Sequence, residues 1–263
     1  MVRRSRLTWL LFAALWAVLA FASHAEDDAF FPGWRSRSWP QVPALTGPGP
    51  LDGWRLVIDP GHGGEDSGAC PGTAVCEKEF NLAISQKLNA ILQTYGATVL
   101  MTRTSDQTVA LDDRINFANA NKAHRFLSVH INSATATARG IETWVDADGT
   151  NPSVNPAAEV WRSYAQTIHN NLIQGARSID STVPDRGLKF SGTTPPWSPG
   201  RIRVIRYDLN NSPAALVEIG FISNATDYAL LLRDDYQHAV AFGMAQGFLH
   251  HAADFNPEDG VRQ

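Results

Sequence analysis

Histidine and glutamate side chains stand at the ends of three apolar runs that have the length and composition of buried β-strands. His62 follows the first run within DPGHGG, His130 ends a second within SVHIN, and Glu218 ends a third within LVEIG. In open α/β sheets, binding sites form beyond the carboxyl ends of the strands. Neutral imidazole nitrogens and carboxylate oxygens are zinc ligands in proteins. These residue types in these places therefore predict a metal site at one edge of a sheet.

A further ligand is available a short distance after His62. Glycines flank His62 on both sides, which lets the backbone turn sharply and approach a ligand closely. A catalytic zinc takes three protein ligands and keeps one position for water. Glu77 and Glu79 both stand where a helix is expected to begin. Spacing does not choose between them, because acids there also favour the positive end of a helix by about 0.3–1 kcal/mol.

The elements that must position these residues alternate between strand and helix patterns from Trp54 onward. Short β-branched runs predict strands at Leu56–Asp59, Thr98–Thr102, Phe126–His130, Ile141–Val145, Ile202–Arg206 and Ala215–Ile219. Apolar residues three and four apart predict helices around 80–95, 160–173 and 227–252. This alternation predicts a single α/β domain with a mostly parallel or mixed twisted sheet and helices on both faces.

The N-terminus has the features of a secretory signal peptide over residues 1–25. Its first six residues carry three arginines and no acid, an apolar run follows over 7–21, and small residues precede a cut after Ala25. The run is short for a bilayer-spanning helix of roughly 20 residues; a retained anchor is the alternative. Cleavage changes the formal charge from −4 to −7. We expect an exported protein, periplasmic or extracellular, by either the Sec or the twin-arginine route.

The remaining chain divides into an arm, the α/β domain and a tail. Residues 26–53 are rich in Pro, Gly and Trp and predict an extended arm that partly wraps the domain, with a wall-binding extension as the alternative. The predicted α/β domain covers 54–252, and 253–263 form a polar tail. No segment after the signal is apolar enough to span a membrane. A slightly acidic chain without a basic run is a poor nucleic-acid binder, because that affinity comes mainly from neutralising phosphates.

Several short motifs occur together in the order found in one enzyme family. They are DPGHGG, Glu77-Lys78, Thr102-Arg103, Leu111 with Arg114, SVHIN and LVEIGFISN. Over about residues 55–249 the chain resembles the zinc-dependent N-acetylmuramoyl-L-alanine amidases of the amidase_3 type, which are bacterial cell-wall amidases. The resemblance implies a mixed α/β sheet, one Zn²⁺ per chain and peptidoglycan as the substrate. The bond cut would be the amide between N-acetylmuramic acid and L-alanine.

The resemblance also implies roles for single residues. His62, Glu77 and His130 would be the zinc ligands, since the family's ligand glutamate stands immediately before a lysine, as Glu77 does. Zinc would activate a water and polarise the scissile carbonyl. Glu218 would be the catalytic carboxylate, which takes the proton of the water and delivers it to the leaving amine.

Other polar residues near these motifs are expected to support the site. Asn81 and Asn132 are expected to orient the ligands, and Arg103 and Arg114 are interpreted as partners in structural ion pairs. Of the remaining histidines, His169 and His238 lie within predicted helices and are expected to face solvent, His124 precedes a strand, and His250 and His251 sit near a helix end.

The chain has two cysteines, Cys70 and Cys76, in the loop between His62 and Glu77. In an exported protein this pair predicts a short-loop disulfide that holds the loop leading into Glu77. A pair of zinc thiolates is the competing interpretation, although the histidines and the glutamate already supply enough ligands.

Other features bear on substrate and regulation. About forty residues separate Val145 from Arg186, and a helix takes most of them, so we expect no inhibitory plug and constitutive activity. Trp197, in SGTTPPWSPG, is a candidate for a glycan or peptide groove, with a packed surface loop as the alternative. We expect a monomer, and no activator protein is identifiable. The rival functions are a non-catalytic peptidoglycan-binding protein and a zinc peptidase acting on stem peptides.

Overall fold

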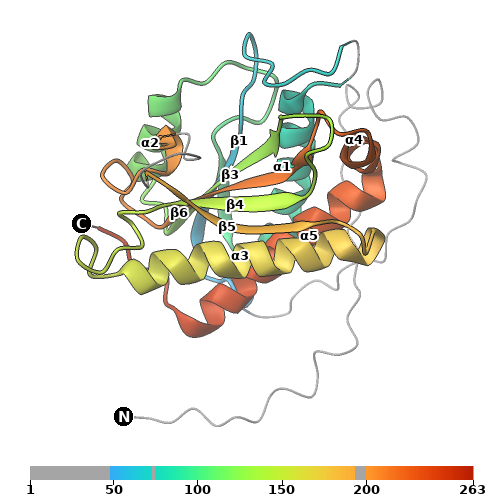
Figure 1. Ribbon diagram of the computed structural model, residues 1–263. Helices are drawn as coiled ribbons and strands as arrows, with labels where there is room; N and C mark the ends of the chain where they lie inside the picture. Colours follow the sequence, from blue (N-terminus) through green and yellow to red (C-terminus); the bar gives the residue numbers. More distant parts are fainter. Residues whose placement is uncertain (1–47, 73–74, 193–199, 263) are drawn as a thin grey trace. The chain divides into compact units, whose positions relative to one another are not determined.

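The computed structural model describes residues 48–72, 75–192 and 200–262 (Figure 1). The predicted signal peptide, most of the predicted arm and Trp197 lie outside the described residues. Within these ranges the strands are β1 (Arg55–Pro60), β2 (Thr98–Met101), β3 (Arg125–Asn132), β4 (Ile141–Asp146), β5 (Asp185–Ser191) and β6 (Ala214–Phe221). The helices are α1 (Glu77–Thr94), α2 (Leu111–Ala120), α3 (Ala158–Ile179), α4 (Ala225–Leu231) and α5 (Asp234–Asp254), with a 3₁₀ turn, η3 (Arg203–Ile205). None of the described helices has the length and apolar character needed to cross a membrane.

The strands form one mixed sheet in the order β2-β1-β3-β6-β4-β5. Strand β4 runs antiparallel to β6, and the other neighbouring pairs are parallel. The start of β4 therefore lies at the same edge of the sheet as the ends of β3 and β6, where Glu142 pairs with Glu218 and Glu218 pairs with His130. This edge collects polar residues from strands of both directions.

Helices cover both faces of the sheet, as predicted. On one face, α5 packs against α1 and α3, which lie on the strands beneath it; α3 and α5 run side by side in Figure 1. Helix α1 turns Phe80, Ile84 and Leu88 inward with no exposed surface. Their spacing of four residues places them on a single stripe of the helix.

The other face is covered by α2 and η3. Buried apolar side chains from both elements pack on strand residues such as Phe126 and Leu216. Because side chains alternate between the faces of a strand, His130 and Glu218 lie on this same face, further along β3 and β6. The cover of α2 and η3 thus borders the polar edge of the sheet.

Two element predictions were wrong for identifiable reasons. The run predicted as a strand at Ile202–Arg206 is the 3₁₀ turn η3, whose Val204 and Ile205 are apolar because they cover the sheet. The fifth strand is Asp185–Ser191, whose largely polar sequence around Gly187 suits an exposed edge strand.

The helix pattern was also incomplete. The segment predicted as one helix over 227–252 is two helices that break between Leu231 and Asp234. Helix α4 has its own start signal, because the Asn224 side chain accepts hydrogen bonds from the backbone N–H groups of Thr226 and Asp227. Helix α2 (Leu111–Ala120) was not predicted.

Candidate active site

His62, Glu77 and His130 converge at the polar edge of the sheet. Glu77 Oε1 lies 3.1 Å from His62 Nε2 and 2.9 Å from His130 Nδ1. Potential ligand atoms of the three residues all lie within 4.8 Å of one another. The three come from the β1–α1 loop, the first turn of α1 and the end of β3. Two imidazoles and one carboxylate form a donor set suited to zinc.

A nearby carboxylate orients His62. Its backbone is left-handed, with φ of 59°, which is uncommon for a residue other than glycine. Asp66 Oδ2 lies 2.8 Å from His62 Nδ1 and directs the other ring nitrogen, Nε2, towards Glu77. Burial alone would lower the pKa of His62, but the carboxylates of Glu77 and Asp66 raise it above its ordinary value. Asp66 was missed in the sequence, where its position four residues after His62 was the available signal.

Glu77 is nearly buried, and both of its carboxylate oxygens are occupied. Oε1 also accepts from the backbone N–H of Ile131 at 3.2 Å and from Asn81 Nδ2 at 3.3 Å, while Oε2 accepts from the N–H of Ala69 at 3.1 Å. Burial would raise the pKa of Glu77, but the hydrogen bonds from His130 and His62 hold it well below its usual range. Glu77 is therefore a fixed carboxylate.

The alternative acid, Glu79, has a different place. Its Oε2 accepts from the backbone N–H of Cys76 at 3.0 Å, which closes the start of α1. Glu77 therefore faces the histidines, while Glu79 caps the helix. The sequence spacing alone left both options open.

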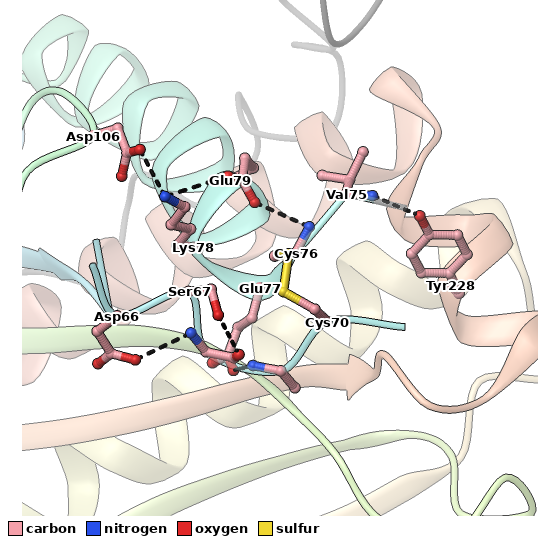
Figure 2. The surroundings of a disulfide bond; sticks show 12 residues. Asp66, Ser67, Cys70, Val75, Cys76, Glu77, Lys78, Glu79, Asp106 and Tyr228 are labelled. Carbon is pink, nitrogen blue, oxygen red and sulfur yellow. Dashed lines mark hydrogen bonds and ion pairs between the residues drawn. A yellow bond between two sulfur atoms is a disulfide. The ribbon is translucent and has the colours of Figure 1, made fainter. Parts of the chain in front are cut away.

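The loop before Glu77 is closed by a disulfide between Cys70 and Cys76, as predicted (Figure 2). The backbone N–H of Glu77 donates to Ala69 O at 2.9 Å, and that of Lys78 donates to Ser67 O at 3.2 Å. The loop thus folds back on the first turn of α1 and carries the N–H that holds Glu77 Oε2. The disulfide lies one residue before Glu77.

His130 fits against Gly61 at the end of β1. A Cβ on Gly61 would lie 2.2 Å from His130 Nε2 and Cε1, so no other residue leaves room for this ring. Glu218 is the partner of His130 across β3 and β6. Its Oε2 is buried without a hydrogen-bond partner in the described part of the chain. Burial, followed by the charges of Glu77 and Glu142, raises the pKa of Glu218 well above its ordinary value.

Glu142 is a third buried carboxylate at this edge, and no motif in the sequence marked it. It is 4% exposed and accepts from Asn132 Nδ2 at 2.9 Å, Trp144 Nε1 at 3.2 Å and Arg186 Nε at 2.8 Å. Asn132 therefore contacts Glu142, whereas Asn81 contacts the carboxylate of Glu77 directly.

A buried polar layer underlies the His62 loop. Asp59 accepts hydrogen bonds from Thr102, Ser128 and Arg114. Arg114 pairs with Asp59 at 2.7 Å, as expected. Arg103 instead donates to backbone carbonyl groups.

The expectation that His169 and His238 face solvent was wrong. Both are buried, and His169 lies between Thr143 Oγ1 at 3.0 Å and Asp185 Oδ1 at 2.8 Å. The polar character of a residue within an amphipathic helix does not reveal that neighbouring strands offer it partners. His251, also buried, accepts a hydrogen bond from Arg125 at 2.9 Å.

The sequence model of the Amidase_3 family, described as N-acetylmuramoyl-L-alanine amidase, matches residues 56–250. This chain belongs to the Amidase_3 family. The match covers every strand except the first residue of β1, together with all the residues that converge at the polar edge.

Individual Amidase_3 relatives agree with this assignment. The chain is 34% identical over 206 residues to the uncharacterized protein YqiI of Bacillus subtilis, covering 78% of this chain and 88% of that protein. It is 36% identical over 195 residues to the sporulation-specific N-acetylmuramoyl-L-alanine amidase of B. subtilis, covering 73% and 66%. The crystal structure of an N-acetylmuramoyl-L-alanine amidase from Clostridium difficile 630 matches with a TM-score of 0.65 and 29% identity, covering 77% of this chain and 98% of that one.

Proposed function

We propose that this Amidase_3 chain is a zinc-dependent enzyme that hydrolyses the amide between N-acetylmuramic acid and L-alanine in peptidoglycan. The observation that carries the proposal is the convergence of His62, Glu77 and His130 beside Glu218. Family membership and the amidase relatives support the substrate and the bond.

The residues present suit one zinc ion. His62 Nε2, Glu77 Oε1 and His130 Nδ1 would hold it, and three protein ligands leave a position for water. When bound, zinc supplies a Lewis acid for the amide carbonyl and a water of lowered pKa. Asp66 and Asn81 keep His62 and Glu77 in place for that task.

Glu218 is the group proposed to move the proton. It faces the ligand set from the neighbouring strand, and its Oε2 has no hydrogen bond to any of the residues that the structure describes. In this proposal, Oε2 accepts a proton from the attacking water and passes it to the departing nitrogen of L-alanine. Glu142 is held in position, because its three donors occupy both of its oxygens.

The place of action follows from the substrate. Peptidoglycan lies outside the cytoplasmic membrane, so residues 1–25 are proposed to act as a secretory signal and to deliver the chain to the periplasm or beyond the cell. Activity without an activator remains part of the proposal, because the segment between β4 and β5 is taken up largely by α3.

Digestion of purified peptidoglycan followed by mass spectrometry tests the proposed reaction. The wild-type chain should release free stem peptides and leave intact glycan strands. Cut peptide–peptide bonds would instead indicate a peptidase, and no product with zinc bound would indicate a binding protein.

The role of Glu218 is tested with Glu218→Gln. Removal of a general acid–base group should lower kcat by about 10²–10⁴-fold with zinc still bound. Glu159→Gln, at an exposed position in the first turn of α3, is the matched control and should retain full turnover. Normal turnover by Glu218→Gln would show that the assigned role is wrong.

A further inference from the structure

Arg103 is a buried cation that lies beneath the loop of His62. It follows β2 and is 1% exposed. Burial, and then the positive charge of Arg114, lowers the pKa of Arg103 to about 10, so the guanidinium remains charged at neutral pH. Among the described residues no carboxylate forms an ion pair with it, so its donors serve another purpose.

Arg103 Nη1 donates to Ser105 O at 3.2 Å in its own loop, and the other donors reach backbone carbonyl groups on two further segments. Arg103 Nε donates to Pro60 O at 2.9 Å, and Nη2 donates to both Gly61 O and Lys78 O at 2.8 Å. Gly61 immediately precedes His62, and Lys78 immediately follows Glu77. A single nitrogen atom thus joins the backbone next to one proposed ligand to the backbone next to another.

The planar shape of the guanidinium sets the distances between the carbonyl groups that it binds. Its donors lie in one plane in a fixed fork, so the carbonyls that accept from them are held at fixed separations. Lysine has only one nitrogen, on a flexible stem, and would not hold Pro60, Gly61 and Lys78 together. Gly63 accommodates the arrangement, because a Cβ there would lie 2.8 Å from Arg103 Cδ.

The loop that Arg103 holds needs outside support. His62 has a left-handed backbone, a conformation that costs free energy in a residue other than glycine and persists where the surroundings fix it. Arg114 supports the same loop through Pro60 O and His62 O, but it does not reach α1. Arg103 hydrogen-bonds to both the loop and α1, and it adds to the direct bonds that two α1 side chains make to the loop, Asn81 to Gly61 O at 3.1 Å and Lys78 to Gly64 O at 2.9 Å.

We propose that Arg103 is a positioning residue that sets the separation of His62 and Glu77 before the metal binds. The inference rests on the proposed function, since it takes these residues as zinc ligands. If the two ligand side chains were mobile, zinc binding would have to order them at a cost in free energy. Side chains that are already held in place avoid this cost. Loss of Arg103 should therefore weaken zinc binding beyond any general loss of stability.

The test compares Arg103→Met and Arg103→Lys with Arg125→Met. Arg125 is the matched control because it is equally buried and also donates to backbone carbonyls and to His251, but at the opposite end of the sheet from His130. Zinc dissociation constants are measured by competition with a chelator, and the folded fraction is measured by circular dichroism in urea.

Both Arg103 variants should bind zinc about 10–100-fold more weakly than wild type, as is typical when support of metal ligands is lost. Arg125→Met should lose stability and keep its zinc affinity. Wild-type affinity in Arg103→Lys, or an equal loss in Arg125→Met, would overturn the proposal; if Arg103→Met does not fold, Arg103→Lys decides. The zinc site itself is tested separately by His62→Ala in the same titration, so a wrong site and a wrong role for Arg103 give different results.

Discussion

At the scale of single residues, the carboxylates at the polar edge differ in their hydrogen-bond partners, and these partners determine the role that each carboxylate can have. Glu77 is fixed by two histidines and two backbone N–H groups, and Glu142 by Asn132, Trp144 and Arg186, whereas Glu218 Oε2 is unpaired in the described chain. A carboxylate with its oxygens saturated is suited to holding a position or a charge. One with a free oxygen is suited to exchanging a proton.

Asp66 offers a prediction at this scale. Asp66→Ala removes the acceptor that orients His62 Nδ1 and should weaken zinc binding by about 10–100-fold. Because the Asp66 side chain is 63% exposed, the free energy of unfolding without metal should change by less than about 0.5 kcal/mol. Chelator competition and urea unfolding measure the two quantities.

Asp66→Asn is the graded variant, since its amide oxygen still accepts a hydrogen bond, and it should bind zinc with intermediate affinity. Equal zinc affinity in all three proteins would show that His62 is oriented by the loop alone.

The residues that sequence reasoning found and missed differ in what marks them. His62 follows an apolar run, and His130 and Glu218 interrupt apolar runs, so their placement at or near the ends of strands was predictable from pattern. Glu142 was not predicted as a site residue, because it reaches the site only through the antiparallel direction of β4. That direction brings the start of β4 beside Glu218. No periodicity reports the direction of a strand.

At the scale of elements, several contacts hold the described residues of the β1–α1 loop in place. The Cys70–Cys76 disulfide, the contacts to the first turn of α1 and the hydrogen bond from Val75 N–H to Tyr228 Oη at 3.1 Å hold it to α1 and α4 (Figure 2). The Lys78 ammonium adds contacts to Gly64 O and Asp106. The loop therefore has little freedom to move Glu77.

The disulfide makes a prediction for this element. The double variant Cys70→Ser, Cys76→Ser should lower the free energy of unfolding by about 2 kcal/mol, as expected for the entropy of closing a short loop. It should also weaken zinc binding, because the loop carries the Ala69 N–H that holds Glu77 Oε2.

Urea unfolding of the metal-free protein and chelator competition give the two values. Wild type treated with reductant should behave as the double variant does. Unchanged zinc affinity in both preparations would mean that the loop is ordered by its other contacts.

The elements show where sequence patterns stop being informative. Strongly periodic stretches such as α1 and α3 and the buried central strands were predicted. The edge strand β5 was missed, because exposed edge strands carry polar residues, and η3 was mistaken for a strand, because a covering turn is as apolar as a core strand. Exposure explains the polar residues of β5, burial explains the apolar residues of η3, and both depend on the tertiary fold.

At the scale of the whole molecule, the end of the sheet opposite the site is built from buried cationic and imidazole groups. Arg125 and His251 are fully or almost fully buried there, and the Arg125 guanidinium lies over the ring of Trp54 at 5.0 Å. Burial, and then the charge of Arg125, lowers the pKa of His251 to about 3. The fold therefore keeps this histidine neutral.

Because the folded protein keeps His251 neutral, we expect the free energy of unfolding to decrease at acidic pH. In the unfolded chain His251 titrates near its ordinary pKa of about 6.5, so between about pH 6.5 and about pH 3 the unfolded state binds the additional proton. Stability should fall as the pH is lowered through this window, by about 2 kcal/mol at pH 5 from His251 alone.

Urea unfolding at pH 7 and pH 5 measures the effect. His251→Gln keeps an acceptor for Arg125 and does not titrate, so it should be less stable than wild type at pH 7 but lose less stability on acidification. An equal loss in both proteins would show that other groups cause the acid sensitivity.

The reversed direction of β4 also divides the connections of the molecule between two edges. The β3–β4 connection (133–140) lies at the edge of the ligand residues and is tied down through Ser223, Asn224 and Asp227. The β4–α3 connection (147–157) lies at the opposite edge. The topology thus places an insertion between β3 and β4 beside the ligand residues, and an insertion directly after β4 at the far edge of the sheet.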